Sequence, residues 1–329
     1  MENKMGKSKK LVGILMAAFG AFLFGIGGVV AGDLLGRKII SASSLVSFRL
    51  TFGGLILLII FFIKDRQQLF DVFKNKRNIL TLIAFGVFGL LFAQSMYTLS
   101  VSLGNPAVAT VLQSLSPSVM ILMTVMFEKS KPSKYLIGAI LLSIFGTFLL
   151  VTNGNMNELS VSTMAVVCGL LSAVGVANFT FIPRKLVKEN QTIIIVGLGL
   201  FIGGVIGNFI SPFWQVSSAA TAWDWAEIAF IAIFSTAIAY AIYLGSLNYI
   251  EPILTSLLDI LEPLTASVAS VVFLGTTLYS VQLVGIAVVI LSVVAINVMD
   301  YYKCKAEDKE ACKNKLKETF DGEVENARV

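Results

Sequence analysis

The chain has 329 residues, of which 56% are hydrophobic and only 14% are charged, with a formal net charge of +5 and no histidine. A soluble domain has about 25% charged residues, so this composition excludes a soluble enzyme and indicates an integral membrane protein. The absence of histidine excludes imidazole metal ligation and histidine proton relays. The three cysteines, Cys168, Cys304 and Cys312, form no CxxC pair and predict neither a zinc site nor a disulfide framework. We therefore expect no metal and no cofactor.

Ten apolar stretches fill the chain between its two charged ends. Each is long enough to cross a bilayer, because a spanning helix needs about 20 mostly apolar residues. The stretches start near Leu11, Leu45, Ile79, Ala107, Tyr135, Val161, Ile193, Ala226, Ile253 and Leu278. The first one follows a lysine-rich arm, and we interpret it as a transmembrane helix instead of a signal peptide because another span follows it. The fold class we expect is an all-α membrane protein with ten transmembrane helices and short loops.

The basic residues fall almost entirely on one side of these stretches. If the N-terminus is cytoplasmic, the inside segments hold 22 of the 25 lysines and arginines. The outside loops hold only Arg37 and Lys38, and Arg49 lies within the second span. The positive-inside rule then predicts a multi-pass protein of the cytoplasmic membrane with both termini in the cytoplasm. Because this topology accounts for the positive charge, the charge gives no indication of nucleic-acid binding.

The two halves of the chain are related by a repeat at an offset of 146 residues. Residues 97–128 and 243–274 share eight identities at this offset, and two prolines, a tyrosine and a phenylalanine are among them. The aromatic and proline pairs are Tyr97/Tyr243, Pro106/Pro252, Pro117/Pro263 and Phe127/Phe273. A unit of five helices has an odd number of crossings, so the second copy must be inverted in the membrane. Inverted repeats are typical of secondary transporters, whose substrate sites lie near the midplane between the repeats.

These features resemble the drug/metabolite transporter superfamily and, within it, the EamA-like transporters. The resemblance covers residues 11–300 and rests on the N-P…S-P segment of helix four and the E-P…L-E-P-L segment of helix nine. The domain organisation expected is a basic cytoplasmic arm (1–10), a first five-helix repeat (11–152), an inverted second repeat (153–300) and a charged cytoplasmic tail (301–329). The resemblance implies a substrate such as an amino acid, a related metabolite or an amphipathic compound.

Prolines divide helices four and nine in the same way. Pro106 and Pro252 mark the helix starts, where a missing N–H is tolerated. Pro117 and Pro263 follow eleven residues later, which is about 16 Å into the membrane and near its midplane. Each of these two prolines leaves the carbonyl four residues earlier without its helical partner. We therefore predict that Pro117 and Pro263 act as hinges.

Polar side chains at this depth are the candidates for binding substrate or protons. They are Glu262, Asp259, Gln113, Ser116, Arg49 and Thr255. An ionised side chain at mid-bilayer costs at least about 2.5–3.5 kcal/mol, so it faces protein or a water-filled cavity. The spacing of Thr255, Asp259 and Glu262 predicts that they share one face of helix nine. Two hypotheses remain open for the acidic pair: a protonated pair that serves only helix packing, or a substrate or proton site, which we favour.

Arg49 also has two interpretations. It either snorkels to the outer interface, or it pairs with an acid or a substrate carboxylate.

The sequence thus predicts a secondary transporter, not an enzyme, that moves a small polar metabolite across the cytoplasmic membrane by alternating access. We expect an exporter, and coupling to protons through Glu262 or Asp259 is the favoured mechanism. The expected partners are a small-molecule substrate, the lipid bilayer and protons. An uncoupled facilitator is one alternative, and a membrane sensor or scaffold that binds without transporting is another.

Overall fold

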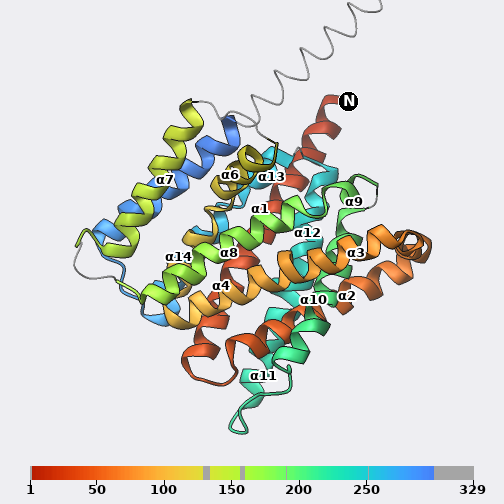
Figure 1. Ribbon diagram of the computed structural model, residues 1–329, viewed down its shortest axis with the longest axis horizontal. Helices are drawn as coiled ribbons and strands as arrows, with labels where there is room; N and C mark the ends of the chain where they lie inside the picture. The colour runs from red at the N-terminus through yellow and green to blue at the C-terminus, as the bar shows by residue number, and fades with distance from the viewer. Residues whose placement is uncertain (1, 129–133, 156–159, 190, 251, 300–329) are drawn as a thin grey trace, which may run out of the picture.

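The computed structural model describes residues 2–128, 134–155, 160–189, 191–250 and 252–299, so the expected cytoplasmic tail (301–329) lies outside the described residues. Within them the chain is helical, apart from loops and one isolated bridge between Ile40 and Val216. In chain order the helices are α1 (Glu2–Gly36), α2 (Ala42–Asp71), the 3-10 turn η1 (Val72–Lys74), α3 (Lys76–Ala84), the π-helical η2 (Phe85–Leu91), α4 (Phe92–Leu103), α5 (Pro106–Gln113), α6 (Ser116–Glu128), α7 (Lys134–Thr152), α8 (Thr163–Phe181), α9 (Arg184–Glu189), α10 (Thr192–Ile210), α11 (Ala222–Ala232), the π-helical η3 (Ile233–Ile238), α12 (Ala239–Gly245), the 3-10 turn η4 (Ser246–Asn248), α13 (Pro252–Leu258), α14 (Leu261–Leu274) and a last helix, Ser280–Met299 (Figure 1).

Nine stretches of the described residues are helical, long and apolar enough to cross a membrane. They coincide with nine of the predicted spans, and the position of the predicted fifth span is taken by a shorter apolar helix, Leu136–Thr152. Several spans consist of consecutive segments: α3, η2 and α4 together form the span Lys76–Leu103. The prediction of an all-α transmembrane fold is therefore confirmed. Helices α5 and α13 begin at Pro106 and Pro252, as the proline pattern predicts.

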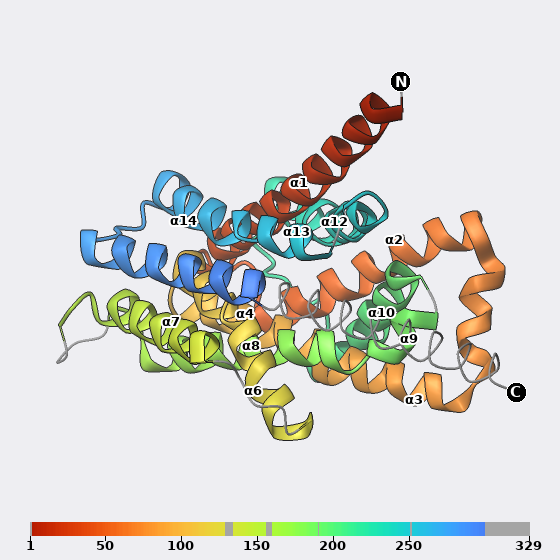
Figure 2. The ribbon, with the colours of Figure 1, turned by 90° about the horizontal axis from the view of Figure 1, so that it is seen from above.

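Most of the helices form two groups that pack against each other (Figure 2). In one group α1 lies against α11, η3, α12, α13 and α14. In the other group α8 lies against η2, α4, α5 and α6. Helix α2 packs against α10, and α5 packs against α14, so that both pairs join the first half of the chain to the second. Helix α7 lies beside the last helix (Figure 1), and a Cβ atom added to Gly146 would lie 2.9 Å from the carbonyl oxygen of Gly285.

Glycine allows the backbones of α2 and α10 to approach closely. A Cβ atom added to Gly204 of α10 would lie 2.7 Å from the Cα atom of Thr51, and one added to Gly54 of α2 would lie 2.9 Å from the Cα atom of Phe201. Helices associate in membranes largely through such small-residue contacts, because lipid offers no hydrophobic drive. This pair of glycines therefore fixes the distance between α2 and α10.

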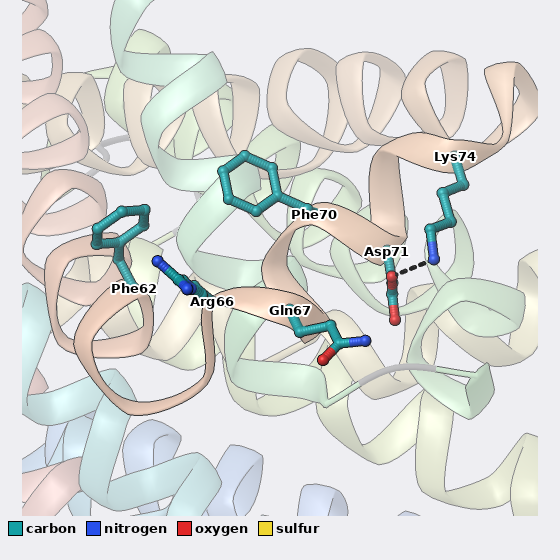
Figure 3. Close-up of a pocket in the computed structure, with 6 residues that line it drawn as sticks. All are labelled: Phe62, Arg66, Gln67, Phe70, Asp71 and Lys74. Carbon is teal, nitrogen blue, oxygen red and sulfur yellow. Dashed lines mark ion pairs between the residues drawn. The ribbon is translucent and has the colours of Figure 1, made fainter.

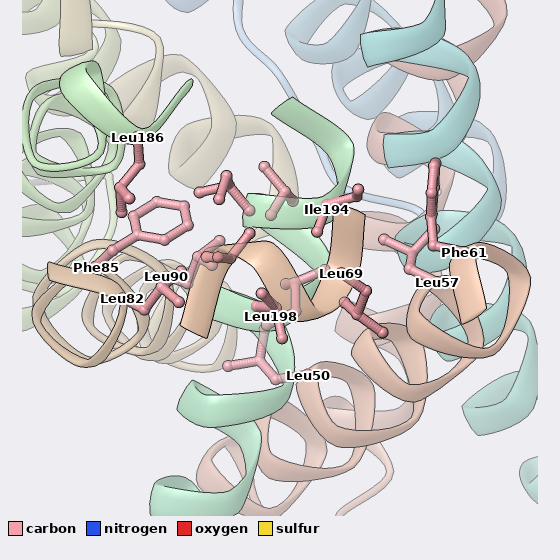
Figure 4. Close-up of a cluster of buried hydrophobic side chains, with 14 of the residues drawn as sticks. Leu50, Leu57, Phe61, Leu69, Leu82, Phe85, Leu90, Leu186, Ile194 and Leu198 are labelled. Carbon is pink, nitrogen blue, oxygen red and sulfur yellow. The ribbon is translucent and has the colours of Figure 1, made fainter. Parts of the chain in front are cut away.

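A buried apolar cluster fills the end of the α2–α10 pair next to α3 and α9 (Figure 4). Phe85 and Leu82 contribute from the span that includes α3, and Ile194 contributes from α10. Leu69 and Val72 also belong to the cluster, although they lie beyond the end of the apolar span Ala42–Ile63. The cluster therefore fixes the orientation of the α2 extension outside the span.

Candidate functional site

Arg49 is buried inside the protein and does not reach the surface. It lies on α2, is only 5% exposed, and its Nε atom donates to the hydroxyl of Thr236 at 3.2 Å. The Thr236 hydroxyl in turn donates to the carbonyl of Ile231, five residues earlier, at 2.8 Å. Thr236 lies in the π-helical segment η3, and such widened turns are frequent at functional sites. The π-helical turn η3 thus holds the guanidinium of Arg49, which belongs to α2.

The ninth span is broken at the acidic pair. Helix α13 ends at Leu258 and α14 begins at Leu261, so Asp259 lies in the intervening turn and Glu262 lies in the first turn of α14. The carbonyl of Asp259 accepts from the amide of Glu262 at 2.9 Å, because Pro263 has no N–H to offer it. The prediction that Thr255, Asp259 and Glu262 share one face of helix nine is therefore corrected, because the helix is interrupted between them.

The two carboxylates lie close to Arg49 and to a pair of tyrosines. Glu262 interacts electrostatically with both Asp259 and Arg49, and Asp259 interacts with the hydroxyl of Tyr243. Tyr240 is within electrostatic range of all three charged groups. Asp259 and Glu262 are half-buried as residues, whereas Arg49 is buried. The ion pairs within 4.0 Å among the described residues do not include Arg49, so Arg49 forms no direct ion pair with either carboxylate.

Several polar atoms around these charges are buried without a hydrogen-bond partner in the described part of the chain. They are the hydroxyls of Tyr97 and Ser235 and the amide oxygen of Gln94. An unsatisfied buried polar group costs about 1–3 kcal/mol. Such a group in a native protein calls for a water, an ion or a ligand. These atoms and the charged groups of Arg49, Asp259 and Glu262 form a polar cluster. The cluster therefore has hydrogen-bonding groups that are not used within the described part of the protein.

Glycines of α1 make room for this cluster. A Cβ atom on Gly28 would overlap the hydroxyl of Tyr97, and one on Gly27 would overlap the side chain of Ser235. A Cβ atom on Gly25 would lie 2.7 Å from the backbone carbonyl of Glu262. The glycine-rich part of α1 thus lies directly against the polar cluster.

Of the other predicted site residues, Thr255 contacts Asp259 through the backbone, because its carbonyl accepts from the Asp259 amide at 3.2 Å. Gln113 ends α5 and Ser116 begins α6, so they flank a second helix break, and Pro117 follows it directly. No hydrogen bond connects Gln113 or Ser116 to the acidic pair among the described residues. The hydroxyl of Thr255 lies 3.2 Å from that of Ser246. The structure therefore groups Arg49 with the two carboxylates and places Gln113 and Ser116 at a different helix break.

Tyr97, Tyr240, Tyr243 and Thr236 were not predicted as site residues from the sequence. A signal for Tyr97 and Tyr243 was present, because they are an identical pair of the internal repeat. For Tyr240 and Thr236 no pattern in the sequence was available, since their roles depend on contacts with residues far along the chain.

Comparison with known proteins shows the family of the chain. The profile of the EamA-like transporter family matches residues 11–152 and, separately, residues 163–298. The chain belongs to the EamA-like transporter family. This EamA-like protein is 31% identical over 305 residues to the "Uncharacterized inner membrane transporter YicL" of Salmonella typhimurium, covering 92% of the chain and 100% of the relative. It is 24% identical over 264 residues to the "Uncharacterized transporter YyaM" of Bacillus subtilis, covering 77% and 83% of the two chains.

A solved structure described as "Crystal structure of protein" has the same fold as this EamA-like chain. The TM-score is 0.58 at 14% sequence identity, over 89% of this chain and 97% of the other. The EamA-like protein is thus a multi-pass membrane transporter that is embedded in a lipid bilayer and acts on a small-molecule substrate.

Proposed function

We propose that this protein is a secondary transporter that exports a small polar metabolite across the cytoplasmic membrane by alternating access. The observation that carries the proposal is the cluster of Arg49, Asp259 and Glu262 at the break of a membrane helix. Broken helices near the midplane are the places where secondary transporters bind substrates and coupling ions. Ionisable residues inside a membrane are costly and mark substrate or ion pathways.

The charges of the cluster suggest the chemistry of the substrate. The guanidinium of Arg49 is suited to a carboxylate, which it can bind through two parallel hydrogen bonds. Asp259 or Glu262 is suited to a proton or to a cationic group. The unpartnered hydroxyls of Tyr97 and Ser235 supply further donors and acceptors. An amino-acid-like compound combines these features, and proton binding at Glu262 or Asp259 couples its movement to the proton gradient.

We further propose an inverted repeat of two five-helix units, residues 11–152 and 153–300, with α7 as the fifth span and both termini in the cytoplasm. Three features support it. The family profile matches the chain twice. The helix breaks at 114–115 and 259–260, and the π-helical segments η2 and η3, recur at nearly the 146-residue offset. The helices packed around α8 also correspond to those packed around α1 when about 146 is added to their residue numbers. Pro117 and Pro263 then serve as hinges at the two breaks.

Transport into inside-out vesicles tests the proposal. Vesicles that contain the protein are incubated with a mixture of amino acids and related metabolites, and the contents are read by mass spectrometry. We expect at least one compound to accumulate above the level in empty vesicles, and a protonophore to abolish the accumulation. The matched variant Arg49→Gln should lose uptake of the compound at low concentration.

Two alternative outcomes point to the rival functions. Transport that a protonophore does not alter indicates an uncoupled facilitator. Binding of a compound without any uptake indicates a membrane sensor or scaffold.

A further inference from the structure

A second candidate site lies at the end of α2, away from the polar cluster. Helix α2 continues past the apolar span Ala42–Ile63 to Asp71, and η1 extends it to Lys74. The side chains at positions 62, 66, 70 and 74 recur every four residues and therefore follow one helix face. Together with two neighbours they line an open pocket of about 500 Å³: Phe62, Arg66, Gln67, Phe70, Asp71 and Lys74 (Figure 3). Under the proposed topology this end of α2 faces the cytoplasm.

One part of the pocket is aromatic and exposed. Phe62 is 51% and Phe70 58% exposed, and their rings meet edge to face with centroids 6.4 Å apart. Ile63 beside them is 80% exposed. Large apolar side chains that remain exposed where a span leaves the hydrocarbon core are in position to contact acyl chains. The opposite face of the same segment is fixed by Leu69 and Val72 in the buried cluster, so the aromatic face is held outward.

The other part of the pocket is basic. Arg66 is exposed, and it forms no ion pair with the described residues. The Nζ atom of Lys74 lies 2.6 Å from a carboxylate oxygen of Asp71, but the Lys74 side chain is still 74% exposed. Residues 64–77 contain five basic and two acidic residues. The segment therefore presents a net positive charge next to an apolar surface.

We propose that this pocket binds one anionic phospholipid of the surrounding leaflet. The phosphate group lies between Arg66 and Lys74, and the upper part of an acyl chain lies along Phe62 and Phe70. Charge complementarity selects the occupant, because basic pockets at the membrane surface attract anionic headgroups. The aromatic side chains bind the hydrocarbon that a soluble phosphate lacks, and the position at the end of a span gives direct access from the bilayer.

Native mass spectrometry of the full-length protein in detergent, titrated with phosphatidylglycerol or phosphatidylcholine, tests the site. We expect tighter binding of phosphatidylglycerol, and a loss of about fivefold in its affinity for Arg66→Gln, since one basic residue near the surface contributes about 1 kcal/mol. Asp71→Asn should raise the affinity for phosphatidylglycerol, because it removes a negative charge beside Lys74. A damaged fold would not produce such a gain.

Lys134→Gln is the matched control, because it removes one exposed positive charge from the start of α7, outside the pocket. It should leave the affinity for phosphatidylglycerol unchanged. Equal binding of the two lipids, or equal losses for Arg66→Gln and Lys134→Gln, would overturn the proposal. Displacement of phosphatidylglycerol by millimolar inorganic phosphate would also overturn it and would assign the pocket to a soluble anion.

Discussion

Replacing Gly204 by alanine tests the contact between α2 and α10. The added Cβ atom would lie 2.7 Å from the Cα atom of Thr51, whereas carbon atoms in favourable contact are about 3.5–4.0 Å apart. The two helices must then separate by about 1 Å, or the turn must distort. The same movement would disturb the hydrogen bond from the Asn208 amide to the Thr51 hydroxyl, which is 2.9 Å long. Inserting a carbon into a packed interior costs about 1–3 kcal/mol, so we expect the unfolding temperature to fall by roughly 2–8 °C.

Thermal unfolding of the purified protein in detergent, followed by size-exclusion fluorescence, provides the assay. Gly138→Ala is the matched control, because a Cβ atom there has no neighbouring atom within 4 Å. Alanine is the better helix former by about 1 kcal/mol, so the control should be neutral or slightly stabilising. An unfolding temperature for Gly204→Ala equal to that of Gly138→Ala would refute the close approach of α2 and α10.

Three further predictions concern topology, the ion pair of Arg37 and the site. In a cysteine-free background, a cysteine at Ser218 should react with an impermeant maleimide added to whole cells and one at Asn75 should not; the reverse pattern would invert the topology. Arg37→Gln should lower the unfolding temperature, because Arg37 pairs with Asp224, whose side chain is only 2% exposed and lies at the start of another span; an unchanged melting curve would contradict this. Thr236→Val should weaken substrate binding without reducing membrane insertion, because it removes the hydroxyl that accepts from the buried arginine of α2; unchanged affinity would show that this hydrogen bond does not position the arginine.

The helices were predictable because their signal is local. Composition alone shows long apolar stretches, and the basic residues in the gaps predict how these stretches are oriented in the membrane. The proline positions predicted the starts of α5 and α13 and indicated which carbonyls would lose their partners. The short helix α9, Arg184–Glu189, was not predicted, because its six polar and apolar residues carry too little periodicity.

The candidate site was predictable only in part. Asp259 and Glu262 could be singled out because charge within a span is unusual. The partner of Arg49 could not be found, because Thr236 lies 187 residues further along the chain and in a π-helical turn that hydrophobic periodicity does not reveal. The break between α13 and α14 was signalled by Pro263. Its consequence, a carboxylate in the turn and another at the start of the next helix, depends on how the chain resumes the helix.

The most direct test of the transport mechanism compares the two neutralised carboxylates in proteoliposomes with an imposed pH gradient. The substrate is the compound found in the vesicle screen, and insertion of each variant is confirmed by its thermal unfolding. Glutamine keeps the size and hydrogen-bonding capacity of glutamate but cannot exchange a proton. We predict that Glu262→Gln remains folded and loses gradient-driven transport. Normal pH-dependent transport by both Glu262→Gln and Asp259→Asn would contradict the account.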